Sequence, residues 1–317
     1  MKKILLLLLI ILIVAAAVYF FWPEIETLIQ RFNPVPPERP TGPPPSASES
    51  KLKIMSSNQV FDYWPGNDGS LIYLTEEGQI YKISPDGSEK EIISETARDI
   101  QSIKASYDGN FILLSFGFPN PIFSVLDTRS GNWKPLPEGT ASAAWEPNRL
   151  RLAYLRDLGS FSTLNLLNTN DSKITEVAKL NQKNLELEWI LPDEIYLTER
   201  PAAALPSSLW SLNIKTKVLR KIVSDENGLM IKWADDGSVG LKFQRRDNEN
   251  SLVLMDKNGR VLNIPLFDTT LPVKCAVDSE KIYCGVPREI LPGTILPDDY
   301  LKRKIYLNDD ILAWDIA

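Results

Sequence analysis

The sequence contains no histidine. Without an imidazole, the chain has no Ser-His-Asp or Cys-His catalytic centre, no histidine general acid or base and no histidine-based zinc site. An enzyme built from these residues would need a pair of carboxylates, or a metal ion held by oxygen ligands.

The acidic residues offer little support for that chemistry. Two tight pairs lie near the C-terminus, Asp298-Asp299 and Asp309-Asp310, and neither has the spacing of a calcium-binding loop. We interpret both pairs as charged loop residues in water. The sequence therefore predicts a protein without catalysis, metal or other cofactor.

Cysteine is nearly absent as well, with two residues in the whole chain. Cys275 and Cys284 flank a predicted turn at residues 278–281, which would place them opposite each other on adjacent strands. In an oxidising compartment they would form a disulfide, and the alternative is a pair of buried free thiols. No cysteine lies near the N-terminus, which argues against a lipid anchor attached to a cysteine.

The chain has little positive charge to offer a polyanion, because its formal net charge is -6. Residues 1–50 contain as many basic as acidic side chains, so the whole excess of negative charge falls on the remainder. Such a surface argues against nucleic acid as a partner.

A segment of about 42 residues recurs six times between residues 59 and 317. Each copy reads as an apolar strand, a tight turn, a second apolar strand, a loop and a third strand. The turns follow one another at intervals of 40 to 45 residues and stand at Asp68-Gly69, Asp108-Gly109, Asn148-Arg149, Asp193-Glu194, Asp236-Gly237 and Asp278-Ser279. This period, with about four strands in each unit, predicts an all-β, six-bladed β-propeller over residues 51–317.

Two kinds of residue repeat with the segment. Asp68, Asp108 and Asp236 precede a glycine, and we interpret them as turn formers rather than metal ligands. Tryptophan recurs near the end of the first strand, where it predicts packing between blades rather than a sugar-binding platform. These residues are Trp64, Trp145, Trp189 and Trp233.

Three stretches of the repeat, IKWADDGSVGLKF, IKASYDGNFILLSF and VLDTRSGNWKPL, resemble the repeat of TolB-like and Trp-Asp-repeat-like propellers. In that repeat an aromatic-Ser-Pro-Asp-Gly turn precedes one strand and an Asp-x-x-Thr-Gly turn follows another. The resemblance covers roughly residues 59–316 and implies a propeller fold and an envelope binding protein. Three of the six turns here lack the glycine, and the α/β domain of TolB has no counterpart in the sequence.

Closing the propeller ring requires one more strand, because the last copy ends on its third strand. Residues 51–57 carry apolar side chains just ahead of the first copy, and we predict that they form the outermost strand of the sixth blade. A natural chain that continues beyond Ala317 is the alternative.

The N-terminus reads as a membrane anchor. Residues 4–22 form an uncharged apolar run that is long enough to span a bilayer as a helix. Lys2 and Lys3 precede it, whereas Glu24 and Glu26 follow it, which places residues 1–3 in the cytoplasm and the propeller outside, in the periplasm or at the cell surface. The alternative is a signal peptide cleaved near residues 15–17.

Residues 23–50 connect the two parts. Apolar residues at helical spacing after Pro23 predict a short juxtamembrane stub. Seven prolines follow between residues 33 and 50, and they predict an extended, semi-rigid linker that holds the propeller away from the membrane.

Two regions of the predicted propeller are candidate binding sites. The longest loops fall on one face of the ring, which is where binding residues are usually placed. The candidate contacts on that face are Phe118, Arg200, Arg245, Arg246, Arg288 and Tyr300. The residues just before the first-strand markers would line the central channel, where Lys104, Glu188, Lys232 and Lys274 are candidates for binding a small anion, with a solvated channel wall as the alternative.

Taken together, these patterns predict a membrane-anchored, extracytoplasmic propeller that binds another protein of the cell envelope and has no catalytic activity. The alternative function is a small-ligand or saccharide binding protein, or a hydrolase, acting at the channel.

Overall fold

The computed structural model describes residues 54–94, 98–117, 120–247, 249–264 and 269–316. The predicted anchor at residues 4–22, the stub and linker at 23–50 and the candidate contact Phe118 lie outside these ranges. Within the ranges given, no helix is long and apolar enough to cross a membrane.

The described residues fold almost entirely into antiparallel β-sheets, in which neighbouring strands are also neighbours in the sequence. Three four-stranded sheets comprise β1 (Val60–Pro65), β2 (Leu71–Thr75), β3 (Ile80–Ile83) and β4 (Glu89–Ile93); β5 (Ile100–Ala105), β6 (Phe111–Phe116), β7 (Ile122–Asp127) and β8 (Trp133–Pro135); and β9 (Thr140–Trp145), β10 (Arg151–Asp157), β11 (Ser162–Asn168) and β12 (Ile174–Leu180). A seven-stranded sheet comprises β13 (Leu185–Leu191), β14 (Glu194–Glu199), β15 (Pro206–Asn213), β16 (Leu219–Trp233), β17 (Gly240–Arg246), β18 (Glu249–Met255) and β19 (Val261–Leu262). A three-stranded sheet comprises β20 (Cys275–Val277), β21 (Lys281–Pro287) and β22 (Asp309–Asp315). The prediction of an all-β fold is confirmed.

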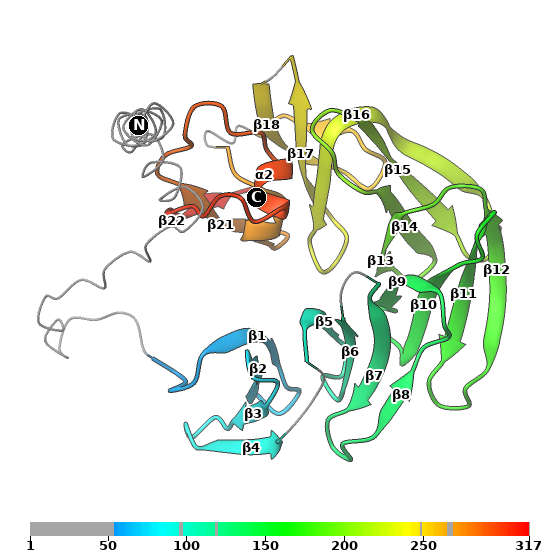
Figure 1. Ribbon diagram of the computed structural model, residues 1–317, viewed down its shortest axis with the longest axis vertical. Helices are drawn as coiled ribbons and strands as arrows, with labels where there is room; N and C mark the ends of the chain where they lie inside the picture. Colours follow the sequence, from blue (N-terminus) through cyan, green and yellow to red (C-terminus); the bar gives the residue numbers. More distant parts are fainter. Residues whose placement is uncertain (1–53, 95–97, 118–119, 248, 265–268, 317) are drawn as a thin grey trace, which may run out of the picture. The chain divides into compact units, whose positions relative to one another are not determined.

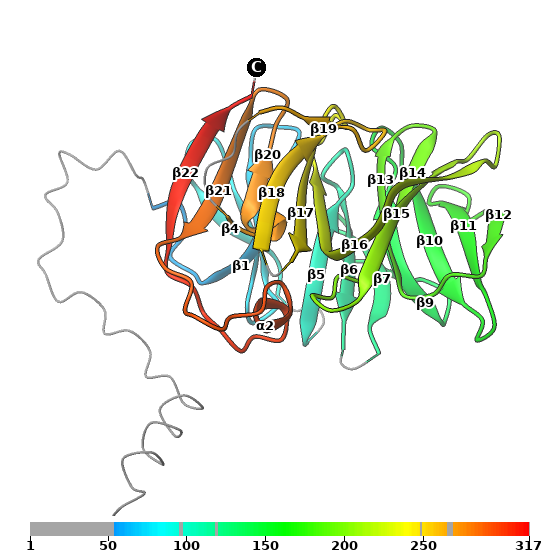
Figure 2. The same ribbon diagram turned by 90° about the horizontal axis from the view of Figure 1, so that it is seen from above.

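The sheets follow one another around a common centre, with β1, β5, β9 and β13 toward the inside (Figure 1). The view from above shows them standing side by side, with α2 (Asp298–Leu301) at one end of the strands (Figure 2). A short 3-10 helix, η1 (Pro272–Lys274), leads into β20.

Strand β16 belongs to two neighbouring groups of strands. Its first half pairs with β15, and its second half, from Asn227 to Trp233, pairs with β17. The register shifts between the halves, where Asp225 and Gly228 have positive φ angles of 52° and 68°. The seven-stranded sheet is thus two four-stranded groups joined through one bent strand.

The repeated Asp-Gly turns have the geometry that the sequence predicts. The carboxylates of Asp68, Asp108 and Asp236 each accept a hydrogen bond from the backbone N–H two residues later, at 2.9 to 3.1 Å. The glycine that follows each aspartate has a positive φ angle between 68° and 75°, which glycine adopts without steric cost. The interpretation of these aspartates as turn formers is confirmed.

The recurrent tryptophans pack between sheets. Trp64 Nε1 donates to the backbone oxygen of Gly109 at 3.2 Å, and Trp145 Nε1 donates to that of Lys104 at 2.9 Å. Trp189 lies under the guanidinium of Arg151, and Trp233 packs on the ring of Tyr196 with centroids 4.5 Å apart. Each contact crosses from one sheet or four-stranded group to the next, so the predicted role of these residues is confirmed.

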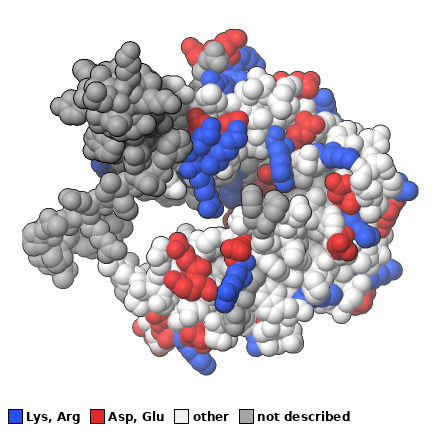
Figure 3. Space-filling model, in the orientation of Figure 1, with Lys and Arg blue, Asp and Glu red and all other residues white. Residues whose placement is uncertain are grey.

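Five hydrophobic clusters fill the spaces between successive groups of strands, from β1–β4 round to β20–β22. None of the five combines residues of the β1–β4 sheet with residues of the β20–β22 sheet, among the side chains that the structure describes. Figure 3 shows a hollow between these two parts of the ring. Among the described residues, apolar packing therefore joins all successive groups except the first and the last.

The last sheet contains three strands among the described residues. Residues 54–57 carry no strand, and residues 51–53 lie outside the description, so the closing strand at 51–57 stays a prediction. Cys275 and Cys284 are opposed on β20 and β21, with Cα atoms 4.1 Å apart, and they form a disulfide. Of the two alternatives that the sequence left open, the structure contains the bonded pair.

Candidate functional site

The connection between β21 and β22, residues 288–308, folds against the neighbouring loops. The backbone N–H of Ala203 donates to Asp298 Oδ1 at 2.7 Å. A Cβ atom on Gly228 would lie 3.2 Å from Pro297 Cδ, which shows how closely this segment approaches β16. Leu296 is fully buried in the cluster shared by β17, β18, β20 and β21. The segment is therefore fixed in place by both polar and apolar contacts.

The acidic pair on α2 provides part of this anchoring. Lys302 pairs with Asp298 at 3.0 Å and Lys304 pairs with Asp299 at 3.3 Å, and the two carboxylate side chains are only 24% and 16% exposed. The backbone N–H of Ala203 lowers the pKa of Asp298, and that of Ile295 lowers the pKa of Asp299. The prediction that Asp298 and Asp299 are merely solvated loop charges is wrong, because both accept hydrogen bonds that hold the segment.

No group of three or more metal-ligating side chains occurs in the described part of the chain.

We expect Asp298→Asn to lower the free energy of unfolding by about 1–2 kcal/mol at pH 7, because the charged acceptor of a backbone N–H is lost. The folded-state pKa of Asp298 is depressed, so its contribution is complete above the ordinary value of 3.8 and disappears as the pH falls through the folded-state value. Urea unfolding between pH 3 and pH 7 should show the variant and the native protein converging at low pH. Glu249→Gln on β18 is the control and should change little; a difference independent of pH would contradict the expectation.

We define the loop surface as residues 200–205, 245–247 and 288–308. Several apolar side chains on it face water: Leu205, Leu291, Ile295, Leu301 and Tyr306. Leu291 is 64% and Tyr306 78% exposed. Figure 3, drawn in the orientation of Figure 1, shows basic side chains gathered over α2, β17 and β18. The loop surface thus combines exposed apolar groups with positive charge on a protein whose net charge is negative.

The structure brings most of the predicted contact residues onto this surface. Arg200, Arg246 and Arg288 are exposed, and Arg288 pairs with Asp310 on β22 at 2.6 Å. Arg245 is half-buried. Tyr300 is half-buried as well, packed against the cluster beneath α2 and lying under the ammonium group of Lys274.

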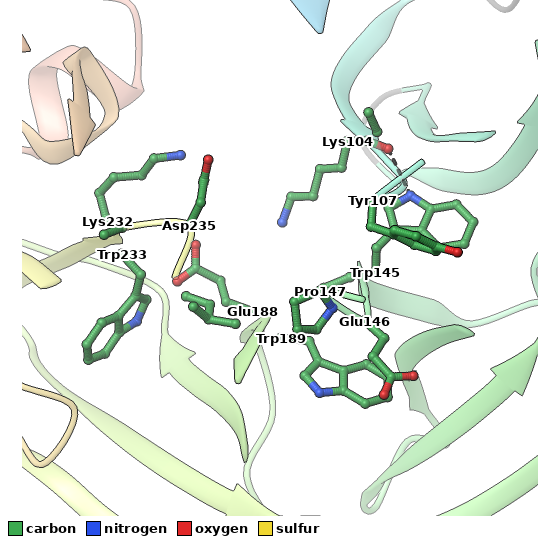
Figure 4. Close-up of a pocket in the computed structure, with 14 residues that line it drawn as sticks. Lys104, Tyr107, Trp145, Glu146, Pro147, Glu188, Trp189, Lys232, Trp233 and Asp235 are labelled. Atoms are coloured by element: carbon green, nitrogen blue, oxygen red, sulfur yellow. Dashed lines mark hydrogen bonds between the residues drawn. The ribbon is translucent and has the colours of Figure 1, made fainter. Parts of the chain in front are cut away.

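A cavity of about 460 Å³ occupies the centre of the ring. It is lined by the ends of β5, β9, β13 and β16 and by the turns that follow these strands. The loop surface lies at the start of β13 and at the bend of β16, away from the strand ends that line the cavity, so the two regions are on opposite faces. Figure 4 shows Lys104 and Lys232 extending into the cavity from opposite sides, with the Glu188 carboxylate beside them.

Three of the four predicted channel residues line this cavity: Lys104, Glu188 and Lys232. Lys274 is not among the lining residues; it forms an ion pair with Asp309, and its side chain is 8% exposed. Tyr107 and Asp235 also line the cavity and were not predicted from the sequence. Both stand in the turn that follows the first strand, two residues after Trp233 or its equivalent Ala105, so extending the count from the strand into the turn would have found them.

The charges around the cavity are unevenly compensated. Glu146 is engaged by Arg151, whose Nε and Nη2 donate to it at 2.6 and 2.9 Å. Neither Lys104 nor Lys232 forms an ion pair with any side chain that the structure describes. Burial raises the pKa of Glu188, and the positive charges of Lys104 and Lys232 oppose that rise. Asp235 lies beside Lys232 at the rim (Figure 4).

Comparison with family models and with curated proteins gives no match. Solved structures do match. The chain is similar to the β-propeller domain of the trilobed protease from Pyrococcus furiosus, with a TM-score of 0.52 and 12% identity over 75% of this chain and 82% of that one. It is similar to hydrazine synthase from Kuenenia stuttgartiensis, with a TM-score of 0.51 and 12% identity over 75% and 76% of the two chains.

TolB from Acinetobacter baumannii is also among the similar structures, with a TM-score of 0.46 and 16% identity over 64% of this chain. The match covers 53% of that TolB, so the chain spans about half of its length. At these identities the likeness concerns the fold alone. The β-propeller fold is confirmed by the similarity to a solved propeller domain, and TolB is among the similar structures, as the resemblance of the repeat implied.

Proposed function

We propose that this protein is a membrane-anchored, extracytoplasmic β-propeller without catalytic activity, whose loop surface binds another protein of the cell envelope. The observation that carries the proposal is the combination of firm anchoring and apolar exposure in residues 288–308. Exposed apolar side chains on a rigid support are typical of protein interfaces, because little conformational freedom is lost on binding.

The proposed propeller has six blades. The two halves of β16 each complete a four-stranded group, and counting these groups with the other four sheets supports that number. In this proposal residues 51–57 add the outermost strand of the sixth blade, beside β22. An unpaired β22 would otherwise present a free edge that is prone to pair with other chains.

Two features support the extracytoplasmic location. The Cys275–Cys284 disulfide is of the kind that persists in oxidising compartments. The apolar run at residues 4–22 follows Lys2 and Lys3, which is the arrangement of an anchor with a cytoplasmic N-terminus. In this arrangement the proline-rich linker would let the propeller reach a partner away from the bilayer.

The experiment is cross-linking mass spectrometry in intact cells of origin with the full chain and two double variants. Leu291→Ser with Tyr306→Ser removes the two most exposed apolar side chains of residues 288–308. Val218→Ser with Val261→Ser is the matched control, because these side chains are 51% and 50% exposed at the opposite ends of the strands. Both pairs are on the surface, so both variants should fold.

We expect cross-links to one envelope protein with the full chain, retained by the control variant and reduced at least tenfold by the loop-surface variant. Such a loss corresponds to about 1.4 kcal/mol or more, the usual effect of removing an interface anchor. Equal cross-linking by the two variants would assign the partner to another surface. Failure of the full chain to cross-link any envelope protein would overturn the proposal.

A further inference from the structure

The central cavity places two cationic groups where a ligand can reach both. Lys104 is the second-to-last residue of β5 and Lys232 the second-to-last of β16, and both side chains line the same cavity (Figure 4). Other lysines of the described chain, such as Lys82, Lys215, Lys242 and Lys274, have an aspartate or glutamate within ion-pair distance. These two have none among the described side chains, although carboxylates line the same cavity. Glu188 lies near both lysines, and Asp235 and Asp62 lie near Lys232, so their positive charge is partly offset. No described carboxylate pairs with either ammonium group at ion-pair distance, so both can still contact an anion.

The walls suit an organic molecule rather than a bare ion. Pro147, Ile190 and Ala234 provide apolar surface, and Tyr107, which is 52% exposed, provides an aromatic ring at the rim. A volume of about 460 Å³ lies in the range of small-molecule sites. The lining combines this apolar surface with charged side chains in similar measure.

Glu188 limits the affinity of this cavity for an anion. It lies beside Lys104 and Lys232 and reduces their positive potential, and its own carboxylate would repel a bound anion. Glu186 lies on the same strand and adds further negative charge near Glu188. Neutralising Glu188, by protonation or substitution, should therefore strengthen binding.

We propose that the central cavity binds a small organic monocarboxylate, with the carboxylate group between Lys104 Nζ and Lys232 Nζ and the apolar body against Pro147 and Ile190. This site is separate from the loop surface and lies on the opposite face, so it stands independently of the proposed protein partner.

Benzoate is the probe and benzamide its neutral isostere, each titrated into the full chain in detergent and followed by ligand-observed NMR. Lys104→Ala and Lys232→Ala should each weaken benzoate binding at least about tenfold, the effect expected for losing a charged hydrogen-bond donor. Glu188→Gln should tighten it several-fold at pH 7 and should flatten its pH dependence. Lys90→Ala, an exposed lysine on β4, is the control and should bind as the native protein does.

Thermal unfolding of each variant separates loss of binding from loss of fold. Benzoate binding that is unchanged in both lysine variants would overturn the proposal, as would equal binding of benzamide. If inorganic phosphate bound as tightly as benzoate, the positive charges alone would account for binding. That result would overturn the proposal that the ligand is an organic monocarboxylate with an apolar body. An absence of binding by both the native protein and Glu188→Gln would mean that the three residues form an internal charge network only.

Discussion

Replacing Glu226 with alanine is expected to lower the free energy of unfolding by about 3–5 kcal/mol, the usual cost of leaving a buried charge without its partner. Lys242 on β17 is 3% exposed, and its ammonium group donates to both carboxylate oxygens of Glu226 at 3.0 and 2.9 Å. The Glu226 side chain is itself 19% exposed. Removing it would leave the ammonium group of Lys242 buried and unpaired.

The position of this ion pair adds to its effect. Glu226 lies at the bend of β16, next to Asp225, where the strand leaves β15 and begins to pair with β17. The pair therefore joins two four-stranded groups at the one place where they share a strand. Loss of Glu226 should therefore weaken the contact between the two four-stranded groups and also leave the charge of Lys242 uncompensated.

Urea denaturation provides the measurement for Glu226→Ala. The double variant Lys242→Met with Glu226→Leu is the matched control, and it should recover most of the lost stability because it removes both charges and keeps similar volume. A loss below about 1 kcal/mol in Glu226→Ala would show that Lys242 finds another partner or reaches water, and would contradict the expectation.

Phe243→Ala is expected to lower the free energy of unfolding by a similar amount, about 3–5 kcal/mol, because it leaves a large cavity in the core. Phe243 is fully buried on β17 and belongs to the cluster that also contains Leu296 of the 288–308 segment. A Cβ atom on Gly228 would lie 3.4 Å from Phe243 Cε1 and 3.2 Å from Pro297 Cδ, so the phenyl ring lies just beneath the loop surface.

The same variant should loosen the loop surface. Leu296 and Pro297 would lose part of the apolar support on which residues 288–308 rest, so amide hydrogen exchange in that segment should speed up more than in β9–β12. Phe243→Leu is the control and should cost less than about 1.5 kcal/mol. Equal stability of the alanine and leucine variants would mean that the site collapses around the missing ring.

The repeated pattern predicted the strands and their turns well, because both depend on local chemistry. The Asp-Gly turns at Asp68, Asp108 and Asp236 were predicted correctly, since the aspartate carboxylate and the positive φ of glycine act within four residues. The tryptophans could be assigned to packing between blades because an apolar side chain that recurs at the same place in each unit must meet its neighbour. Which of the two neighbours each tryptophan contacts was visible only in the structure.

The sequence by itself determined the all-β class, the register of the repeats, the opposition of Cys275 and Cys284 and the absence of histidine chemistry. Tertiary structure alone decided that Asp298 holds the backbone of Ala203, that Glu226 neutralises Lys242 and that Lys232 faces the cavity while Lys274 pairs with Asp309. The physical reason is that turn formation and strand pairing within a repeat depend on residues close in sequence. The partner of a charged side chain depends instead on how loops from distant repeats pack against one another. That packing cannot be predicted from a local sequence pattern.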